Sequence, residues 1–152
     1  MQRSSEIRTG RHCVFLLHVH LVFATKYRKN IFNEEHLKTL RTIFEKICKD
    51  FDAELKEFNG ASDHVHLLVE YPPKVTISKL VNSLKGVSSR KLKELHPELK
   101  EYYWKNALWS PSYFAGSCGG APLKIIKQYI EKQKSATSEK EEIKRQNRMS
   151  SN

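Results

Sequence analysis

Two stretches of alternating sequence decide the fold: LLHVHLVF at residues 16–23 and DHVHLLVEY at residues 63–71. Each contains His-Val-His. Successive side chains of a β-strand point to opposite faces, so the two histidines of a pair share a face, roughly 7 Å apart along the chain. Either pair could therefore hold a metal ion, and the spacing alone does not choose between them.

The first of these stretches belongs to a longer strand, predicted over residues 12–24. Both faces of this strand are largely apolar, which is typical of a central strand. One face would carry Cys13, Phe15, Leu17, Val19, Leu21 and Phe23, and the other Val14, Leu16, His18, His20 and Val22. We therefore expect His18 and His20 deep in an apolar strand. His64 and His66 follow Asp63 and a turn, near a strand end where sites open to solvent.

Hydrophobic periodicity predicts the remaining elements outward from these strands. Helices are expected at 34–51, with Asn33 as the N-cap, at 76–95 and at 122–135. Strands are expected at 53–60 and 63–71, which form a hairpin, and at 112–118. The order β-α-β-β-α-β with an additional C-terminal helix predicts an α+β protein with a ferredoxin-like split βαβ fold and an antiparallel sheet. The first and third strands are central neighbours in that fold, so the two His-Val-His pairs would lie side by side.

The length of 152 residues predicts one domain, over residues 1–135, and the charged residues 136–152 form an expected flexible tail. No apolar run approaches the roughly 20 residues of a membrane span. The first residues, MQRSSEIRTGR, lack the apolar core of a signal peptide. We therefore expect a cytoplasmic protein without a membrane partner.

The charge of the chain indicates the kind of partner. Lysine and arginine number 27 against 17 acidic residues, which gives a formal net charge of +10. The basic residues are dispersed along the chain, as expected for a folded basic surface that meets a polyanion.

A third motif is KQYIEKQ at residues 127–133. On a helix, Tyr129 and Gln133 are four residues apart and therefore neighbours. A tyrosine in this position is most often an ordinary, partly buried aromatic residue. The motif therefore indicates a catalytic role only together with the other motifs of the chain.

Four stretches in order, DHVHLLVE, LKGVSSRKL, LWSPSYF and GGAPLKIIKQYIEKQ, resemble the single-tyrosine HUH transposases, the TnpA type of small bacterial and archaeal insertion sequences. HLVFATKYRKNIF also resembles the opening strand of that family, and the resemblance covers residues 12–135. It implies that His64, His66 and Gln133 bind Mg²⁺ or Mn²⁺ and that Tyr129 is the nucleophile. His18 has no counterpart in the motif. His20 is then a core residue or a group beside the site.

The resemblance also implies an activity. Such an enzyme cleaves and rejoins single-stranded DNA at insertion-sequence ends through a 5′-phosphotyrosine intermediate, and it recognises subterminal DNA hairpins. It implies a homodimer in which Gly119 and Gly120 let the helix of one subunit complete the active site of the other in trans. The candidates for contacts with DNA are Arg11, Lys26, Arg28, Lys85 and Arg90.

Three alternatives stay open. The chain could be a non-catalytic module that binds single-stranded nucleic acid, or a domesticated relative that processes repeated genomic hairpins. It could also be a metal-dependent hydrolase that uses water as its nucleophile and has no need of Tyr129.

Overall fold

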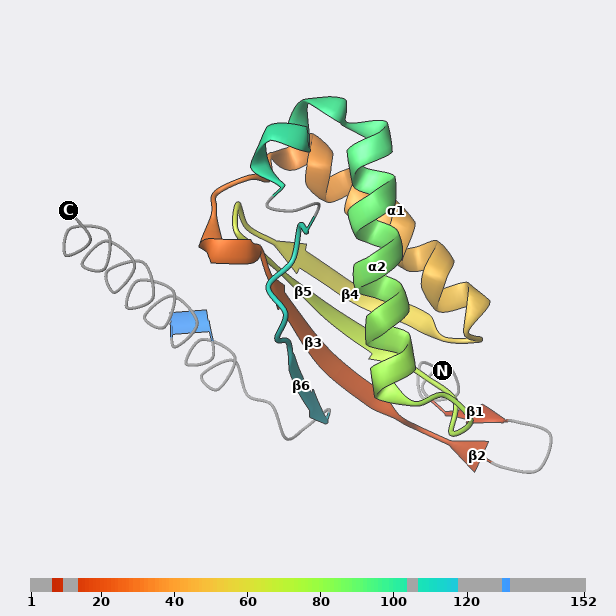
Figure 1. Cartoon of the computed structure of the whole chain (residues 1–152). Helices are drawn as coiled ribbons and strands as arrows, with labels where there is room; N and C mark the ends of the chain where they lie inside the picture. Colours follow the sequence, from red (N-terminus) through yellow and green to blue (C-terminus); the bar gives the residue numbers. More distant parts are fainter. Residues whose placement is uncertain (1–6, 10–13, 104–106, 118–129, 132–152) are drawn as a thin grey trace.

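The computed structural model describes residues 7–9, 14–103, 107–117 and 130–131. Four antiparallel strands form its main sheet in the order β4-β5-β3-β6: β3 (His18–Ala24), β4 (Glu54–Gly60), β5 (His64–Glu70) and β6 (Phe114–Ser117). The helices α1 (Glu34–Asp50) and α2 (Ile77–Leu95) lie side by side over one face of the sheet (Figure 1). The α+β, ferredoxin-like arrangement is confirmed, with the first and third predicted strands as central neighbours. Of the helix predicted over 122–135, only Ile130 and Glu131 are described, and both are helical.

The core lies between the sheet and these two helices. Alternate residues of the central strands point into it, and so do the apolar stripes of both helices, as their periodicities predict. Its members include Val19, Leu21, Phe23, Val65, Leu67, Val69, Leu40, Phe44, Leu80 and Leu84. Burying one such large side chain contributes about 1.5–3 kcal/mol, so this face supplies much of the stability of the fold.

The pairing of β3 with β5 fixes what lies on the opposite face of the sheet. His18 pairs with Glu70, Val22 with His66, and Ala24 with His64. Directly paired residues of neighbouring strands point to the same face. All four histidines of the two His-Val-His motifs therefore share the face that turns away from the core.

Two predictions about the first strand are wrong. Val14–Phe15 forms a separate strand, β2, which pairs with β1 (Arg8–Thr9), and β3 begins only at His18. Val14 is 69% exposed and Leu16 is 48% exposed, so the second apolar face ends before the sheet starts. His18 consequently lies at the start of a strand, and both His18 and His20 are partly exposed, not deep in an apolar strand.

Local hydrogen bonds explain where α1 begins and ends. The Asn33 side chain accepts from the His36 N–H, and His36 Nδ1 accepts from the Asn33 N–H, so the predicted N-cap is confirmed as part of a capping box. At the other end the Ala53 N–H donates to the Cys48 carbonyl, and Asp52 adopts φ 56°, which is the turn that closes many helices. Within the described ranges, neither helix has the length and apolar composition of a membrane span.

Candidate active site

The candidate site lies at the beginning of β5, on the face of the sheet that turns away from α1 and α2. This face is called the open face below. His64 and His66 stand there as neighbours on one face, and both are partly exposed. The adjacent strand β3 brings His20 to the same place. Because β3 and β5 are the two central strands, the site rests on the best supported part of the sheet.

His64 is oriented by a carboxylate that is itself fixed. Its Nδ1 lies 2.8 Å from Asp63 Oδ1, while Asp63 Oδ2 accepts from Arg28 Nε at 3.1 Å and from Arg28 Nη2 at 2.8 Å. Since the carboxylate accepts, His64 Nδ1 carries the proton and Nε2 keeps the lone pair that a metal would need. Burial acts to raise the pKa of Asp63, but the hydrogen bonds from His64 and Arg28 outweigh it and hold that pKa below its ordinary value.

His66 meets a different partner. Its Nε2 lies 3.0 Å from His20 Nδ1, and the two rings stack with centroids 5.2 Å apart. Burial lowers the pKa of His66, and nearby His20 and His64 lower it further, against the opposing effect of Glu57. A neutral imidazole is the form that binds metal ions. Of the two interpretations of His20, the geometry supports a group beside the site.

His18 takes part in another cluster, at the far end of β5. Its Nε2 lies 3.3 Å from Oε2 of Glu70, a carboxylate that is fully buried. Arg8 Nε lies 3.4 Å from the same carboxylate, and Lys56 Nζ lies 3.8 Å from it. The histidines of the first pair are thus divided between two clusters, which the identical spacing of the two motifs could not reveal.

A turn with strained backbone angles positions Arg28 at the site. The 3₁₀ turn Lys26–Arg28 holds Tyr27 at φ 59° and Arg28 at φ 53°, a region that non-glycine residues rarely adopt. Buried Thr25 anchors the turn, because its N–H donates to the Asp63 carbonyl at 2.9 Å and its own carbonyl accepts from the Arg28 N–H. The turn and Asp63 are therefore fixed to each other by backbone as well as by side chain.

The remaining members of the predicted site, Tyr129 and Gln133, lie outside the described residues, as do Arg11 and the pair Gly119 and Gly120. Ile130, the residue after Tyr129, is described. Its carbonyl accepts a hydrogen bond from Arg28 Nη1 at 3.0 Å. The chain next to the predicted nucleophile therefore lies beside the group that orients His64.

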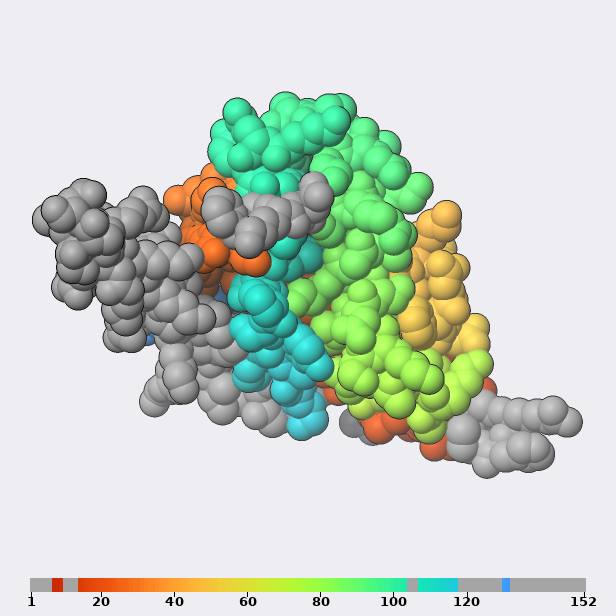
Figure 2. All heavy atoms as spheres, in the orientation of Figure 1, coloured from red at the N-terminus to blue at the C-terminus, as the bar shows by residue number. Residues whose placement is uncertain are grey.

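The other candidates for DNA contacts stay predictions, and the structure gives their surroundings. Half-buried Lys85 donates to the Ser110 carbonyl at 2.6 Å, and burial lowers the pKa of Lys85. Trp109 Nε1 donates to Ser88 Oγ at 3.0 Å, so the KGVSSR motif holds the segment before β6 against α2 (Figure 2). Sequence reasoning missed this role, although Lys85 and Ser88 stand one helical turn apart on α2 and share a side of it. Arg90 is exposed on α2 and Lys26 is partly exposed.

A second cluster has the spacing of a metal site. Ligand atoms of His36, His96 and Glu98 lie within 4.8 Å of one another. However, His36 Nδ1 accepts from the Asn33 N–H, so the proton sits on His36 Nε2, which faces Glu98 Oε1 at 3.2 Å. A metal would have to displace that proton. We therefore assign this cluster to the start of α1 and not to metal binding.

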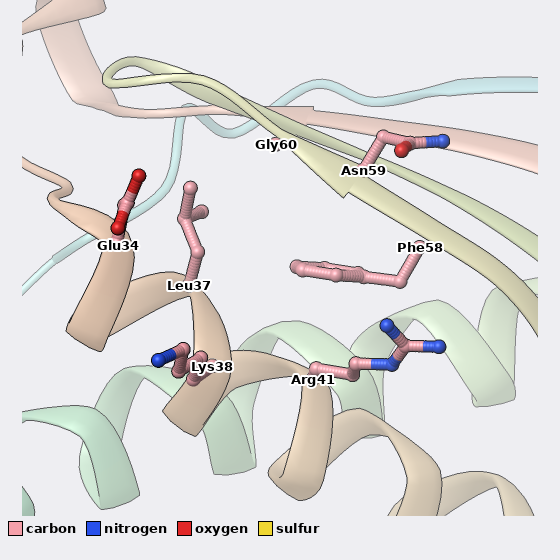
Figure 3. Close-up of a pocket in the computed structure, with 7 residues that line it drawn as sticks. All are labelled: Glu34, Leu37, Lys38, Arg41, Phe58, Asn59 and Gly60. Atoms are coloured by element: carbon pink, nitrogen blue, oxygen red, sulfur yellow. The ribbon is translucent and has the colours of Figure 1, made fainter.

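A surface groove of about 550 Å³ lies between α1 and β4 (Figure 3). The residues lining it are Glu34, Leu37, Lys38, Arg41, Phe58, Asn59 and Gly60. Its cations are balanced on the same helix, because Lys38 lies 3.5 Å from Glu35 and Arg41 lies 3.2 Å from Glu45. It holds none of the predicted ligands or nucleophiles, so the open face remains the candidate site.

Comparisons with known proteins indicate the family to which the chain belongs. The sequence model of the family described as "Transposase IS200 like" matches residues 13–133. The ISDra2 transposase TnpA of Deinococcus radiodurans is 34% identical over 128 residues, which cover 84% of this chain and 91% of that protein. The transposase for insertion sequence element IS200 of Salmonella typhimurium is 35% identical over 118 residues, which cover 76% and 78%.

Solved structures lead to the same group. A crystal structure of a Deinococcus radiodurans R1 protein superposes with a TM-score of 0.77 at 36% identity, over 83% of this chain and 97% of that one. A REP-associated tyrosine transposase bound to a REP hairpin superposes with a TM-score of 0.50 at 14% identity, over 72% and 61%, and shares the fold. The predicted resemblance is confirmed. With its fold, its paired histidines and these relatives, the chain belongs to the IS200-like family of transposases.

Proposed function

We propose that the chain is a transposase that cleaves and rejoins single-stranded DNA at insertion-sequence ends through a 5′-phosphotyrosine on Tyr129. One observation carries this proposal. The Arg28 guanidinium contacts both the carboxylate that orients His64 and the carbonyl of Ile130, the residue after Tyr129. A candidate metal ligand and the neighbour of a candidate nucleophile thus share one partner.

The chemistry would proceed as a balanced exchange of phosphodiester bonds. The Tyr129 hydroxyl gives up its proton and its oxygen attacks phosphorus, which forms the bond from phosphorus to tyrosine as the bond from phosphorus to the 3′ oxygen breaks. A proton ends on the released 3′-hydroxyl. Another 3′-hydroxyl can later attack the tyrosyl phosphate, so rejoining needs no ATP. Tyrosine has an ordinary pKa of about 10, so the hydroxyl must lose its proton with help from its surroundings.

The family implies a divalent metal, and the described residues fit one. His64 presents Nε2 because Asp63 occupies Nδ1, and the lowered pKa of His66 favours the neutral form of that ring. We propose that His64, His66 and Gln133 hold Mg²⁺ or Mn²⁺, and imidazole ligands suit Mn²⁺ better. When bound, such an ion stabilises negative charge on the phosphate as a Lewis acid. These neutral ligands would leave the charge of the ion undiminished.

We propose DNA hairpins near the element ends as the recognised structure. The net charge of +10 suits such a partner, and the REP-associated neighbour is bound to a hairpin. Relatives named for insertion sequences match at 34% and 35% identity, whereas the REP-associated protein matches at 14%. Insertion-sequence ends are therefore favoured over dispersed genomic repeats as the substrate, and the cytoplasm stays the predicted location.

We also propose a homodimer whose active sites are completed in trans. The resemblance to the family is what supports this arrangement. In the single chain Arg28 contacts its own Ile130, so in trans Ile130 of the partner subunit would take that place. Mixing a Tyr129→Phe chain with a His64→Ala chain tests this. In trans, the heterodimer recovers one working site. In cis, it recovers none.

A covalent-adduct assay tests the proposed function. Single-stranded DNA from the flanks of the gene is labelled at its 3′ end, mixed with protein and Mn²⁺, and run on a denaturing gel. We expect a labelled band at the protein mass that disappears with chelator, in Tyr129→Phe and in His64→Ala. Cleavage without an adduct would support the hydrolase with a water nucleophile. Binding of this DNA without cleavage would support the non-catalytic module.

A further inference from the structure

We propose that Arg28 is a positioning residue that latches Ile130, the residue after Tyr129, to Asp63 and so to the proposed metal ligand His64. The inference rests on the proposed function, in which Tyr129 is the nucleophile and His64 a ligand. It assigns to Arg28 a task inside the protein in place of the predicted contact with DNA. The task is to make the position of Ile130 and the orientation of His64 depend on one side chain.

The guanidinium of Arg28 divides its donors between two segments far apart in sequence. Nε and Nη2 donate to Asp63 Oδ2 at 3.1 and 2.8 Å, while Nη1 donates to the Ile130 carbonyl at 3.0 Å. The planar fork of arginine can serve a carboxylate and a carbonyl together, which the single ammonium of lysine does poorly. An arginine at this position is therefore suited to bridge Asp63 and the Ile130 carbonyl.

The carboxylate of Asp63 links Arg28 to the proposed metal ligand, His64. Its Oδ2 is held by Arg28, and its Oδ1 accepts from His64 Nδ1 at 2.8 Å. This bond sets both the tautomer and the ring orientation of His64. Loss of such an outer partner typically weakens metal binding by about 10–100-fold. Arg28 should therefore influence metal affinity even without DNA.

Burial and backbone strain favour the bridge over a phosphate contact. The Arg28 side chain is 8% exposed, so little of it faces an incoming phosphate. Tyr27 and Arg28 both have positive φ, at a cost of about 1–3 kcal/mol each. Backbone bonds offset this strain: the Thr25 N–H donates to the Asp63 carbonyl, and the N–H groups of Ile31 and Phe32 donate to the Ser62 carbonyl. A mobile surface arginine would need no such support.

Substitutions separate the two halves of the bridge. Arg28→Ala removes both contacts. Arg28→Lys keeps a positive charge for Asp63 but lacks the fork that also reaches the Ile130 carbonyl. Asp63→Asn leaves a single accepting oxygen, so this side chain can no longer accept from His64 and Arg28 together, while Arg28 can still donate to the Ile130 carbonyl. Arg41→Ala is the matched control, because Arg41 pairs with Glu45 on the exposed side of α1, away from β5.

Three measurements read out these variants. The first is Mn²⁺ affinity without DNA, from paramagnetic resonance of the free ion. The second is amide hydrogen exchange of the peptide that contains Ile130 and Glu131. The third is the rate of adduct formation at saturating Mn²⁺. Thermal melting followed by circular dichroism shows whether each variant is folded.

We expect Arg28→Ala to weaken Mn²⁺ binding by about 10–100-fold and to speed exchange of the Ile130 peptide. Arg28→Lys should keep most of the Mn²⁺ affinity, yet speed the exchange and slow adduct formation by up to about 100-fold, since misplacing a reacting group costs that much. Asp63→Asn should weaken Mn²⁺ binding without speeding exchange. Arg41→Ala should change none of these. If Arg28→Ala does not fold, the lysine variant decides the question.

The opposite pattern would overturn the inference. If folded Arg28 variants keep wild-type Mn²⁺ affinity and exchange but bind DNA more weakly, with a shallower salt dependence, Arg28 is a phosphate contact. Failure of the proposed function looks different. In that case wild-type protein forms no adduct, or Tyr129→Phe still forms one, while the metal and exchange measurements made without DNA continue to test the latch.

Discussion

Alternate residues of β5 point to opposite faces of the sheet, and the two faces differ in burial and polarity. Val65, Leu67 and Val69 face the helices and are fully buried. His64 and His66 face the opposite way, remain partly exposed and meet polar partners. Strand geometry thus keeps the residues that stabilise the fold apart from those proposed to do chemistry, although they are neighbours in sequence.

The open face itself divides into two ends. At one end, the Nδ1–H of His64 donates a hydrogen bond to Asp63, so His64 presents Nε2. At the other end, His18 lies against the buried carboxylate of Glu70 together with Arg8. The difference teaches that the partner of a histidine, and not the His-Val-His spacing, separates a candidate ligand from a histidine that packs against a buried carboxylate.

The largest effect is expected on the core face. Leu67→Ala should lower the free energy of unfolding by about 2–5 kcal/mol, because it leaves a cavity in a fully buried position. Urea denaturation measures this change. A loss below about 1 kcal/mol would mean that the helix-covered face supports the fold less than its burial indicates.

On the open face, His64→Ala should leave stability within about 1 kcal/mol of wild type, as is usual for partly exposed positions. It should reduce adduct formation at least about 100-fold, because a bound metal contributes several kcal/mol to charge stabilisation. His18→Ala is the matched control from the other pair. It should keep adduct formation but lose about 1–3 kcal/mol of stability, since Glu70 stays buried with one partner fewer.

His20→Ala tests whether His20 is a metal ligand or a group beside the ligands. It removes the ring that contacts His66, so we expect about a tenfold loss of Mn²⁺ affinity, with the number of ions bound per chain unchanged. Calorimetric titration gives affinity and stoichiometry together. A loss of bound metal equal to that of His64→Ala would make His20 a ligand and contradict its place beside the site.

Two glycines extend the comparison to smaller effects. A Cβ on Gly86 of α2 would meet nothing within 4 Å, so Gly86→Ala should stabilise the helix by about 0.5–1 kcal/mol. A Cβ on Gly60 of β4 would lie 2.5 Å from Leu37 Cδ2, the end of a flexible and partly buried side chain that can move, so Gly60→Ala should destabilise by no more than about 1 kcal/mol. Thermal melts of the two variants should shift in opposite directions. A Gly86→Ala chain that is more stable but binds DNA less would indicate that a partner approaches α2 there.

The smallest effect at neutral pH concerns Cys48, where burial, with a smaller contribution from Glu45, raises the thiol pKa to about 12. The folded state then holds the thiol proton more tightly than the unfolded state. Its contribution is complete below a pH of about 8.5 and is lost as pH rises towards the folded pKa. Cys48→Ala should flatten the fall of unfolding free energy between about pH 9 and 10.5 relative to wild type. Equal slopes would contradict the raised pKa.

Much of this fold could be predicted because its signals are local. Alternation identified β5 within one residue at each end, and Asn33 before an apolar stripe identified the start of α1. The break before His18 was missed, since Val14 and Leu16 are apolar and yet exposed. Periodicity records which side chains could be buried, and it does not record whether another element covers them.

The site was predictable only in part. The pairing of β3 with β5 follows from topology and brings the histidines together. The partners that give each histidine its role come from elsewhere, because Arg28 lies 35 residues before Asp63 and Glu70 lies 52 residues after His18 in the sequence. Such long-range side-chain contacts leave no periodic signal in a single sequence.

The backbone connection between Thr25 and Asp63 has a consequence for how this protein can diverge. The Thr25 N–H binds the Asp63 carbonyl, and the N–H groups of Ile31 and Phe32 bind the Ser62 carbonyl. Main-chain groups are the same whatever residue carries them. An exposed position between these anchors, such as Lys29, can therefore change in evolution or be redesigned while the scaffold beneath His64 keeps its shape.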